Sequence, residues 1–223
     1  MSNYTCLILT HRDKTSGKVL TPHLEVFKQN NPQCNVHIVI GEDHPQGKRY
    51  NWRNGDQPLR KWWLENSNLV ETENVAVIEW DTLVNCAIPE VPEEFDLVGA
   101  QYMKEPFHLR GKWRCRSQED PKWTPDNWWW WREIPLLELN KGEQACGLVS
   151  LGCFLMRRCV LDAVCKKRWD KVYSKNIISE MRFPTAASIE GARIGQIDLP
   201  FVHHSTMNFS GEKQIYHPIK EAQ

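Results

Sequence analysis

The sequence predicts an α/β fold with a mixed, mostly parallel sheet flanked by helices. Two short apolar runs rich in β-branched residues, 4–10 and 35–41, enclose a segment with helical spacing, which is the β-α-β order that opens a parallel sheet. The runs 74–81 and 96–101 continue the strand pattern. No linker interrupts the 223 residues, and a chain of this length can bury one large core, so we expect a single domain over 1–223.

Helical spacing and terminal signals place the helices of the first half. Thr21 followed by Pro22 is typical of an N-cap and a first helical residue, and the Asn-Asn-Pro segment 30–32 predicts the end of that helix. Apolar and aromatic residues predict a short helix over 58–66. The connection after the third strand is rich in proline, which suits a bend rather than a helix.

The second half begins with an interruption of the α/β pattern. Segment 103–145 contains four prolines and six tryptophans, and we interpret it as a Trp-rich insertion that packs on the sheet edge or covers a site. A glycine-containing strand over 146–158 resumes the pattern, and an amphipathic helix follows over 158–169. A further helix around 177–188 and a late strand over 194–200 complete the prediction.

Composition excludes several classes of protein. Lys plus Arg equals Asp plus Glu at 28 each, so the chain has no basic field for nucleic acid. The eight cysteines form no C-x-x-C pair and several lie in apolar runs, which indicates buried free thiols rather than disulfides or zinc ligands. No apolar run approaches the roughly 20 residues that span a bilayer. We therefore expect a soluble, cytoplasmic protein without a transmembrane segment.

Polar side chains follow three of the predicted strands, at 11–13, 42–44 and 79–81. Ligands of open α/β sheets bind at the carboxyl ends of the strands, so these clusters predict one crevice along a sheet edge. Asp81 lies just past a buried strand, where a carboxylate can hold a divalent cation together with phosphate oxygens. The alternative is that Asp81 caps the following turn through its own side chain.

The order of these elements resembles the GT-A class of nucleotide-sugar glycosyltransferases, with Glu79-Trp80-Asp81 in the place of the Asp-x-Asp motif of that class. The first motif position departs from the pattern, since it is Glu rather than Asp. The resemblance implies one GT-A-like domain, with a nucleotide-binding half over 1–101 and an acceptor half and tail over 102–223. It also implies transfer of a sugar from a nucleotide diphosphate sugar, with a UDP-sugar as the expected donor, to a glycan-type hydroxyl, with Mn²⁺ or Mg²⁺ as cofactor.

Segment 50–63 resembles the region before the motif strand in several GT-A families, where polar residues approach the nucleotide. The alternative is that Asn54-Gly55-Asp56 is a turn and N-cap that opens a surface helix. Under the resemblance, the residues that contact the nucleotide donor are His11, Arg12, Asp13, Asn54, Asp56, Arg60 and Glu79.

Segment 178–188 resembles a stretch of inverting GT-A enzymes, including the core-2/I-branching group, in which an acidic residue at a helix start is the catalytic base. This implies that Glu180 takes the proton of the acceptor hydroxyl, with Glu190 as the rival. Each is otherwise a solvated glutamate on a helix. Segment 150–158 resembles the strand that borders the donor sugar, where a glycine lets a sugar approach the backbone. The alternative there is a bulge in a core strand.

The C-terminal tail is rich in histidine, and in metal-dependent GT-A enzymes such a histidine completes the metal site. The candidates are His203 and His204, after a short strand, and His217, in a Tyr-His-Pro turn. Imidazole suits Mn²⁺ alongside carboxylates. Alternatively, Lys213 or Lys220 neutralises the diphosphate, as in metal-independent members.

Four consecutive tryptophans at 128–131 cannot all face one groove, because neighbouring side chains point in different directions in a strand or a helix. Three interpretations of these tryptophans therefore stay open: a platform that stacks on sugars, packing in the core, and a patch at a membrane interface. A non-catalytic carbohydrate-binding protein on the same fold is the alternative to an enzyme. A nucleotidyltransferase is disfavoured, because segment 9–18 has one glycine where a phosphate loop needs several.

Overall fold

The computed structural model describes residues 4–11, 14–41, 54–99, 102–103, 148–149, 152–167, 179–197, 201–203 and 214–217. The tryptophans at 128–131 and nearly all of the predicted insertion lie outside these ranges, so the insertion stays a prediction.

The centre of the fold is a six-stranded sheet in the order β2-β1-β3-β8-β5-β9. Strand β8 runs antiparallel to both of its neighbours, and the other pairings in the sheet are parallel. This confirms the predicted mixed, mostly parallel sheet in a single domain. Its strands are β1 (Tyr4–His11), β2 (Asn35–Gly41), β3 (Asn74–Glu79), β5 (Leu97–Gly99), β8 (Cys153–Arg157) and β9 (Ile194–Gln196).

Smaller sheets and the helices surround this centre. A three-stranded sheet contains β10 (Phe201–His203), β11 (Ile215–His217) and β4 (Leu83–Val84), and a two-stranded one contains β6 (Tyr102–Met103) and β7 (Leu148–Val149). The described helices are α1 (Lys14–Asn30), α3 (Asp56–Asn66), the 3₁₀ turn η1 (Ser67–Leu69), α4 (Arg158–Lys167) and α6 (Ser179–Ile189).

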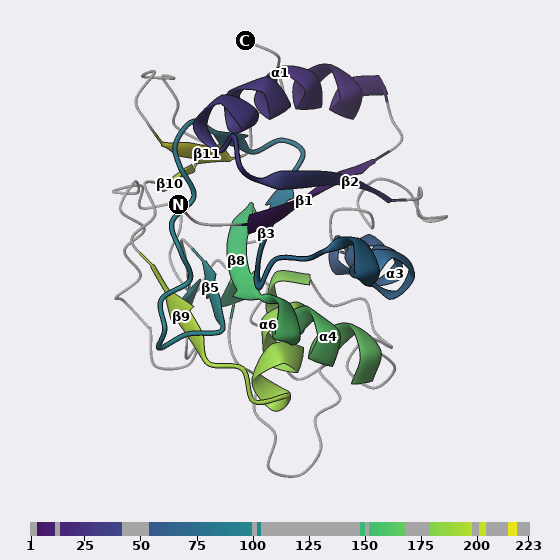
Figure 1. Cartoon of the computed structure of the whole chain (residues 1–223), viewed down its shortest axis with the longest axis vertical. Coiled ribbons are helices and arrows are strands. Elements are labelled where there is room, and N and C mark those ends of the chain that lie inside the picture. The colour runs from purple at the N-terminus through teal and green to yellow at the C-terminus, as the bar shows by residue number, and fades with distance from the viewer. Residues whose placement is uncertain are drawn as a thin grey trace, which may run out of the picture.

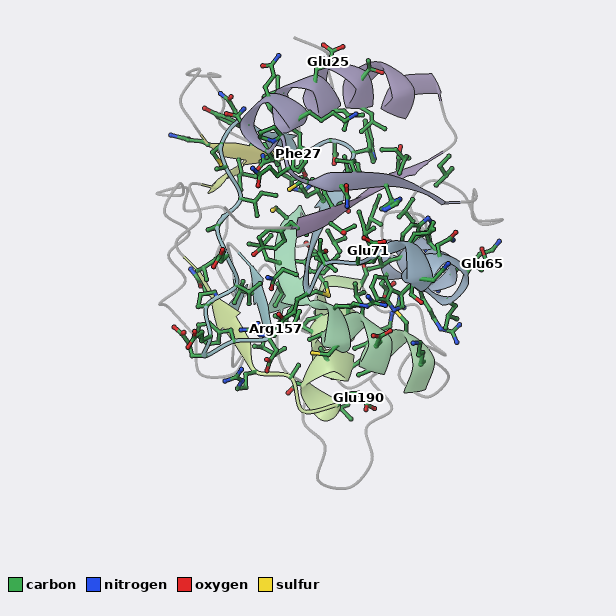
Figure 2. All side chains as sticks on the ribbon, viewed as in Figure 1. Glu25, Phe27, Glu65, Glu71, Arg157 and Glu190 are labelled. Carbon is green, nitrogen blue, oxygen red and sulfur yellow. The ribbon has the colours of Figure 1, made fainter. Side chains whose placement is uncertain are left out.

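The central sheet is covered on both faces, which explains why its strands are continuous apolar runs. Successive residues of β3 point to opposite sides: Val77 packs in the same cluster as Phe183 of α6, whereas Ile78 packs in the cluster that contains Phe27 of α1. Figure 1 accordingly shows α1 on one side of the sheet and α4 and α6 on the other. Figure 2 shows Phe27 on α1, buried toward the sheet, and Glu25, exposed to solvent.

Helix α1 begins at Lys14, so the prediction that Thr21 caps it was wrong. Pro22 lies inside the helix. Leu20, before the proline, packs against the same apolar cluster as Phe27. The apolar face of the helix therefore continues on both sides of Pro22, although the proline has no N–H to donate. The end of the helix is as predicted, because Asn31 Nδ2 donates to the Phe27 carbonyl at 3.2 Å.

The cysteines in the described residues behave as the composition indicates. All six are free, and four of them are buried, at positions 6, 86, 153 and 165. Burial raises the pKa of Cys153 and Cys165 to about 12, so these thiols stay protonated at neutral pH. Across the same ranges no helix has both the length and the hydropathy to cross a membrane.

Candidate functional site

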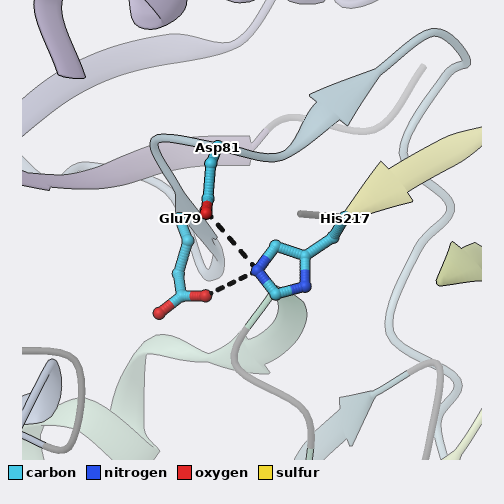
Figure 3. A group of neighbouring side chains, drawn as sticks. All are labelled: Glu79, Asp81 and His217. Atoms are coloured by element: carbon cyan, nitrogen blue, oxygen red, sulfur yellow. Dashed lines mark ion pairs between the residues drawn. The ribbon is translucent and has the colours of Figure 1, made fainter. Parts of the chain in front are cut away.

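Two carboxylates and an imidazole converge beside the carboxyl end of β3. His217 Nε2 lies 2.8 Å from Glu79 Oε2 and 3.5 Å from Asp81 Oδ1. One ligand atom from each of the three residues lies within 4.8 Å of the other two. Figure 3 shows the ring projecting from β11 toward both carboxylates. The three side chains are between 9% and 17% exposed, so the cluster is largely shielded from solvent.

A tight turn after β3 places the two carboxylates together. The Trp80 N–H donates to the Leu9 carbonyl at 2.8 Å, which extends the pairing with β1 by one residue. The Thr82 N–H then donates to the Glu79 carbonyl at 3.0 Å and closes the turn. The Thr82 hydroxyl donates to the Gly152 carbonyl at 2.7 Å and fixes this turn to the start of β8.

Strand pairing brings the third group back from the C-terminal part of the chain. β4 follows the turn directly and pairs antiparallel with β11, with Leu83 opposite Tyr216. His217 is the next residue of β11, so the antiparallel register carries it past Leu83 to the level of the turn. His217 is therefore the last residue of a strand, and the predicted Tyr-His-Pro turn was wrong in that respect.

His217 is the basic group of the cluster and faces two acidic side chains. Burial by itself lowers the pKa of this imidazole, but hydrogen bonds and charge from Asp81 and Glu79 outweigh burial and raise it to about 10. His217 is therefore protonated at neutral pH when no metal is bound, and its single positive charge lies between the two carboxylates. Two carboxylate oxygens and one imidazole nitrogen are a donor set that suits Mn²⁺, so the residues fit the cofactor that the sequence predicts.

His23 of α1 supports the same turn and was missed from the sequence. Its side chain is buried and hydrogen-bonds the backbone of Trp80, and both this bond and the nearby Asp81 charge oppose the effect of burial on its pKa. Burial lowers the pKa of His23, so its ring is neutral. The signal that was available is helical spacing: His23 precedes the buried Phe27 by four residues and shares its face.

Arg182 of α6 binds two of the predicted nucleotide contacts. Its guanidinium is fully buried, donates from both Nε and Nη2 to the Asp56 carboxylate, and donates from Nη2 to Asn54 Oδ1 at 3.1 Å. Arg60 donates to the Cys165 carbonyl at 3.3 Å. These hydrogen bonds connect the start of α3 to α6 and, through Arg60, α3 to α4. The contact of the same three residues with a nucleotide stays a prediction. Residues 54–55 form a turn that opens α3, as in the alternative, but no side chain caps this helix, and Asn54 and Asp56 are buried.

The two candidate bases occupy opposite ends of α6. Glu180 lies in the first turn and is half-buried, whereas Glu190 follows the last residue of the helix. Figure 2 shows Glu190 at the outer end of the helix layer. Ten residues of helix span about 15 Å, so the two carboxylates cannot serve the same reaction centre. The structure does not test which of them acts, and both assignments stay predictions.

The other predicted site residues are placed only in part. His11 is the last residue of β1, and its backbone pairs with Gly41 of β2. His203 ends β10, and its backbone pairs with that of His217. Outside the described residues lie Arg12, Asp13, His204, Lys213 and Lys220.

Known proteins resemble this chain in structure only. Neither models of protein families nor curated proteins match the sequence. A glycosyltransferase involved in glycosylation of the major capsid of PBCV-1 matches with a TM-score of 0.51 and 8% identity, over 96% of this chain and 91% of that one. The bifunctional glycosyltransferase WbbM (apo structure) matches at 0.49 and 12%, over 100% and 46%. An active-site mutant of LgtC matches at 0.47 and 8%, over 96% and 86%.

At 8% identity, the PBCV-1 enzyme shows a shared fold and leaves the activity open. Its similarity extends over nearly the full length of both chains, so it includes the sheet and the helix layers on either side. The predicted fold class is therefore confirmed. The chain has a GT-A-like glycosyltransferase fold and is a distant structural relative of that class.

Proposed function

We propose that this chain is a glycosyltransferase that moves a sugar from a nucleotide diphosphate donor to a hydroxyl of a glycan-type acceptor. The observation that carries the proposal is the convergence of Glu79, Asp81 and His217 beside the carboxyl end of a central strand. That is the edge at which open α/β sheets bind ligands. The group has the donor set of a divalent-metal site, and a metal that neutralises a leaving diphosphate favours the enzyme over a module that only binds carbohydrate.

The donor half of the proposal rests on the metal ligands. Asp81 and His217 hold Mn²⁺ or Mg²⁺, with Glu79 as a third ligand or as a contact to the donor. When bound, such a cation supplies positive charge to the diphosphate as it leaves. The imidazole in the set favours Mn²⁺ over Mg²⁺, which prefers oxygen ligands alone. UDP is the expected nucleotide.

The acceptor half rests on Glu180. β3 residues alternate between the faces of the sheet, so Glu79 shares the face of Val77, on which α6 packs. A carboxylate in the first turn of α6 accepts the proton of the acceptor hydroxyl as that oxygen attacks the anomeric carbon. The bond from that carbon to the diphosphate oxygen breaks on the opposite side, so the sugar is transferred with inversion.

The test is nucleotide binding followed by turnover. UDP, GDP and CMP are titrated calorimetrically with and without Mn²⁺, and one of them is expected to bind tightly only with the metal. Turnover of the matching sugar nucleotide is then measured for Glu180→Gln, which should lower kcat by about 10²–10⁴-fold with donor binding unchanged. Glu190→Gln is the matched control on the same helix. Absence of nucleotide binding in every titration would favour the carbohydrate-binding alternative.

A further inference from the structure

We infer that Gly152 is a positioning residue for the metal site, because its missing side chain leaves the space in which the His217 ring reaches Glu79 and Asp81. The inference rests on the proposed function of that site and adds a residue to it. Segment 150–158 was expected to let a sugar approach the backbone, but the group that lies against Gly152 is an imidazole of the same chain.

The contact between Gly152 and His217 leaves no room for a methyl group. A Cβ built on Gly152 would lie 2.7 Å from both Cγ and Nδ1 of the His217 ring, and 3.2 Å from His217 Cβ. Real Cβ atoms essentially never approach other heavy atoms to 2.7 Å. The two contacts with ring atoms are the severe ones, whereas the 3.2 Å contact with His217 Cβ needs a shift of only a few tenths of an ångström.

Backbone conformation does not explain the glycine. Among the described residues only Gly191 has a positive φ, so Gly152 has a backbone that other residues can adopt. Only packing excludes a larger residue at this position, and the neighbour is His217. Gly152 lies just before β8, and the His217 ring approaches its backbone closely.

Gly152 is also held by the turn that carries the carboxylates. Its carbonyl accepts hydrogen bonds from the Glu79 N–H at 3.3 Å and from the Thr82 hydroxyl at 2.7 Å. A side chain at 152 therefore cannot be accommodated by a shift of this backbone without disturbing Glu79. The remaining response is displacement of His217, which separates the imidazole from the two carboxylates.

The test compares Gly152→Ala with Gly195→Ala. Gly195 is a matched control, because it lies in β9 at the edge of the sheet and a Cβ there would also meet an aromatic ring, that of Phe95. Mn²⁺ alone is titrated into each variant and followed by electron paramagnetic resonance. Gly152→Ala is expected to weaken Mn²⁺ binding at least 10-fold, whereas Gly195→Ala stays within about 2-fold of the wild type. These magnitudes follow the effect of residues that orient metal ligands.

A second readout needs no metal. The free energy of unfolding is measured in urea for Gly152→Ala, His217→Ala and the double variant, without metal. Gly152→Ala is expected to destabilise the wild type but to have little effect in the His217→Ala background, where the ring is absent. The double variant also folds if Gly152→Ala alone does not.

The outcomes separate the inference from the proposed function. Two results would overturn the role of Gly152. One is equal destabilisation by Gly152→Ala in the wild-type and His217→Ala backgrounds. The other is a Gly152→Ala variant that binds Mn²⁺ as tightly as a wild type that binds the ion. If the unfolding data show coupling between Gly152 and His217 but the wild type does not bind Mn²⁺, the proposed metal site is wrong. The positioning role of Gly152 at that site is then wrong as well.

Discussion

Loss of the Asp56 charge is expected to destabilise the fold far more than loss of a similar ion pair at the surface. Asp56 and Arg182 are both fully buried, and Arg182 Nε donates to Asp56 Oδ2 at 2.8 Å, with a second donation from Nη2 to Oδ1. An arginine stays protonated in a protein, so Asp56→Asn removes the Asp56 charge from beside a buried cation.

The magnitude follows from burial. Removing one partner of a buried ion pair costs about 3–5 kcal/mol. The Asn amide still offers one acceptor oxygen, so we expect about 3 kcal/mol, the lower end of that range. For a chain of this length, that corresponds to a fall in Tm of about 6 °C.

Urea unfolding followed by tryptophan fluorescence measures the change, with Arg193→Ala as the matched control. Arg193 also makes two hydrogen bonds to one carboxylate, each 2.9 Å long, but its side chain is 55% exposed. Removing this exposed pair is expected to cost much less than removing the buried one, because solvent screens the two charges. Equal losses for Asp56→Asn and Arg193→Ala would refute the reasoning, because burial would then make no difference.

Three further outcomes follow from the same contacts. Hydrogen bonds from Arg193 lower the pKa of Asp96 to about 2, so its stabilisation is complete above about pH 4 and is lost as the pH falls toward 2. Urea titrations at several pH values across that range should show that Asp96→Asn loses less free energy of unfolding than the wild type as the pH falls. Because His217 is protonated in the metal-free cluster, Mn²⁺ binding near pH 7 should release about one proton, measured by calorimetry in buffers of different ionisation enthalpy. His217→Ala should abolish that release. Trp63 is fully buried and donates from Nε1 to Asp162 at 3.1 Å, so Trp63→Phe should cost about 1–3 kcal/mol in thermal unfolding, and a change below about 0.5 kcal/mol would contradict it.

The strands were predictable where burial leaves a local pattern. The runs that became β1, β2 and β3 are apolar on both faces because helices cover both sides of the sheet. The position of Glu79 and Asp81 at the end of β3 was also predictable, and it is the edge at which open α/β sheets bind ligands.

The contacts that complete the site depend on distant pairings. β4 is only two residues long, which is too short to show a strand pattern, yet it brings His217 to the turn. Arg182 meets Asp56 across 126 positions, and nothing in segment 178–188 indicates a buried counter-charge. Local propensity misplaced the start of α1, because the packing of Leu20 against the core outweighs the signal at Thr21 and Pro22.

Mn²⁺ affinity of the wild type, Asp81→Asn and His217→Ala, measured by electron paramagnetic resonance, tests the proposed metal site most directly. Glu190→Gln, at the far end of α6, is the control. We expect one Mn²⁺ per chain in the wild type, at least 10-fold weaker binding in each of the two site variants, and no change in the control. Equal Mn²⁺ affinity in all four proteins would contradict the assignment of Asp81 and His217 as ligands.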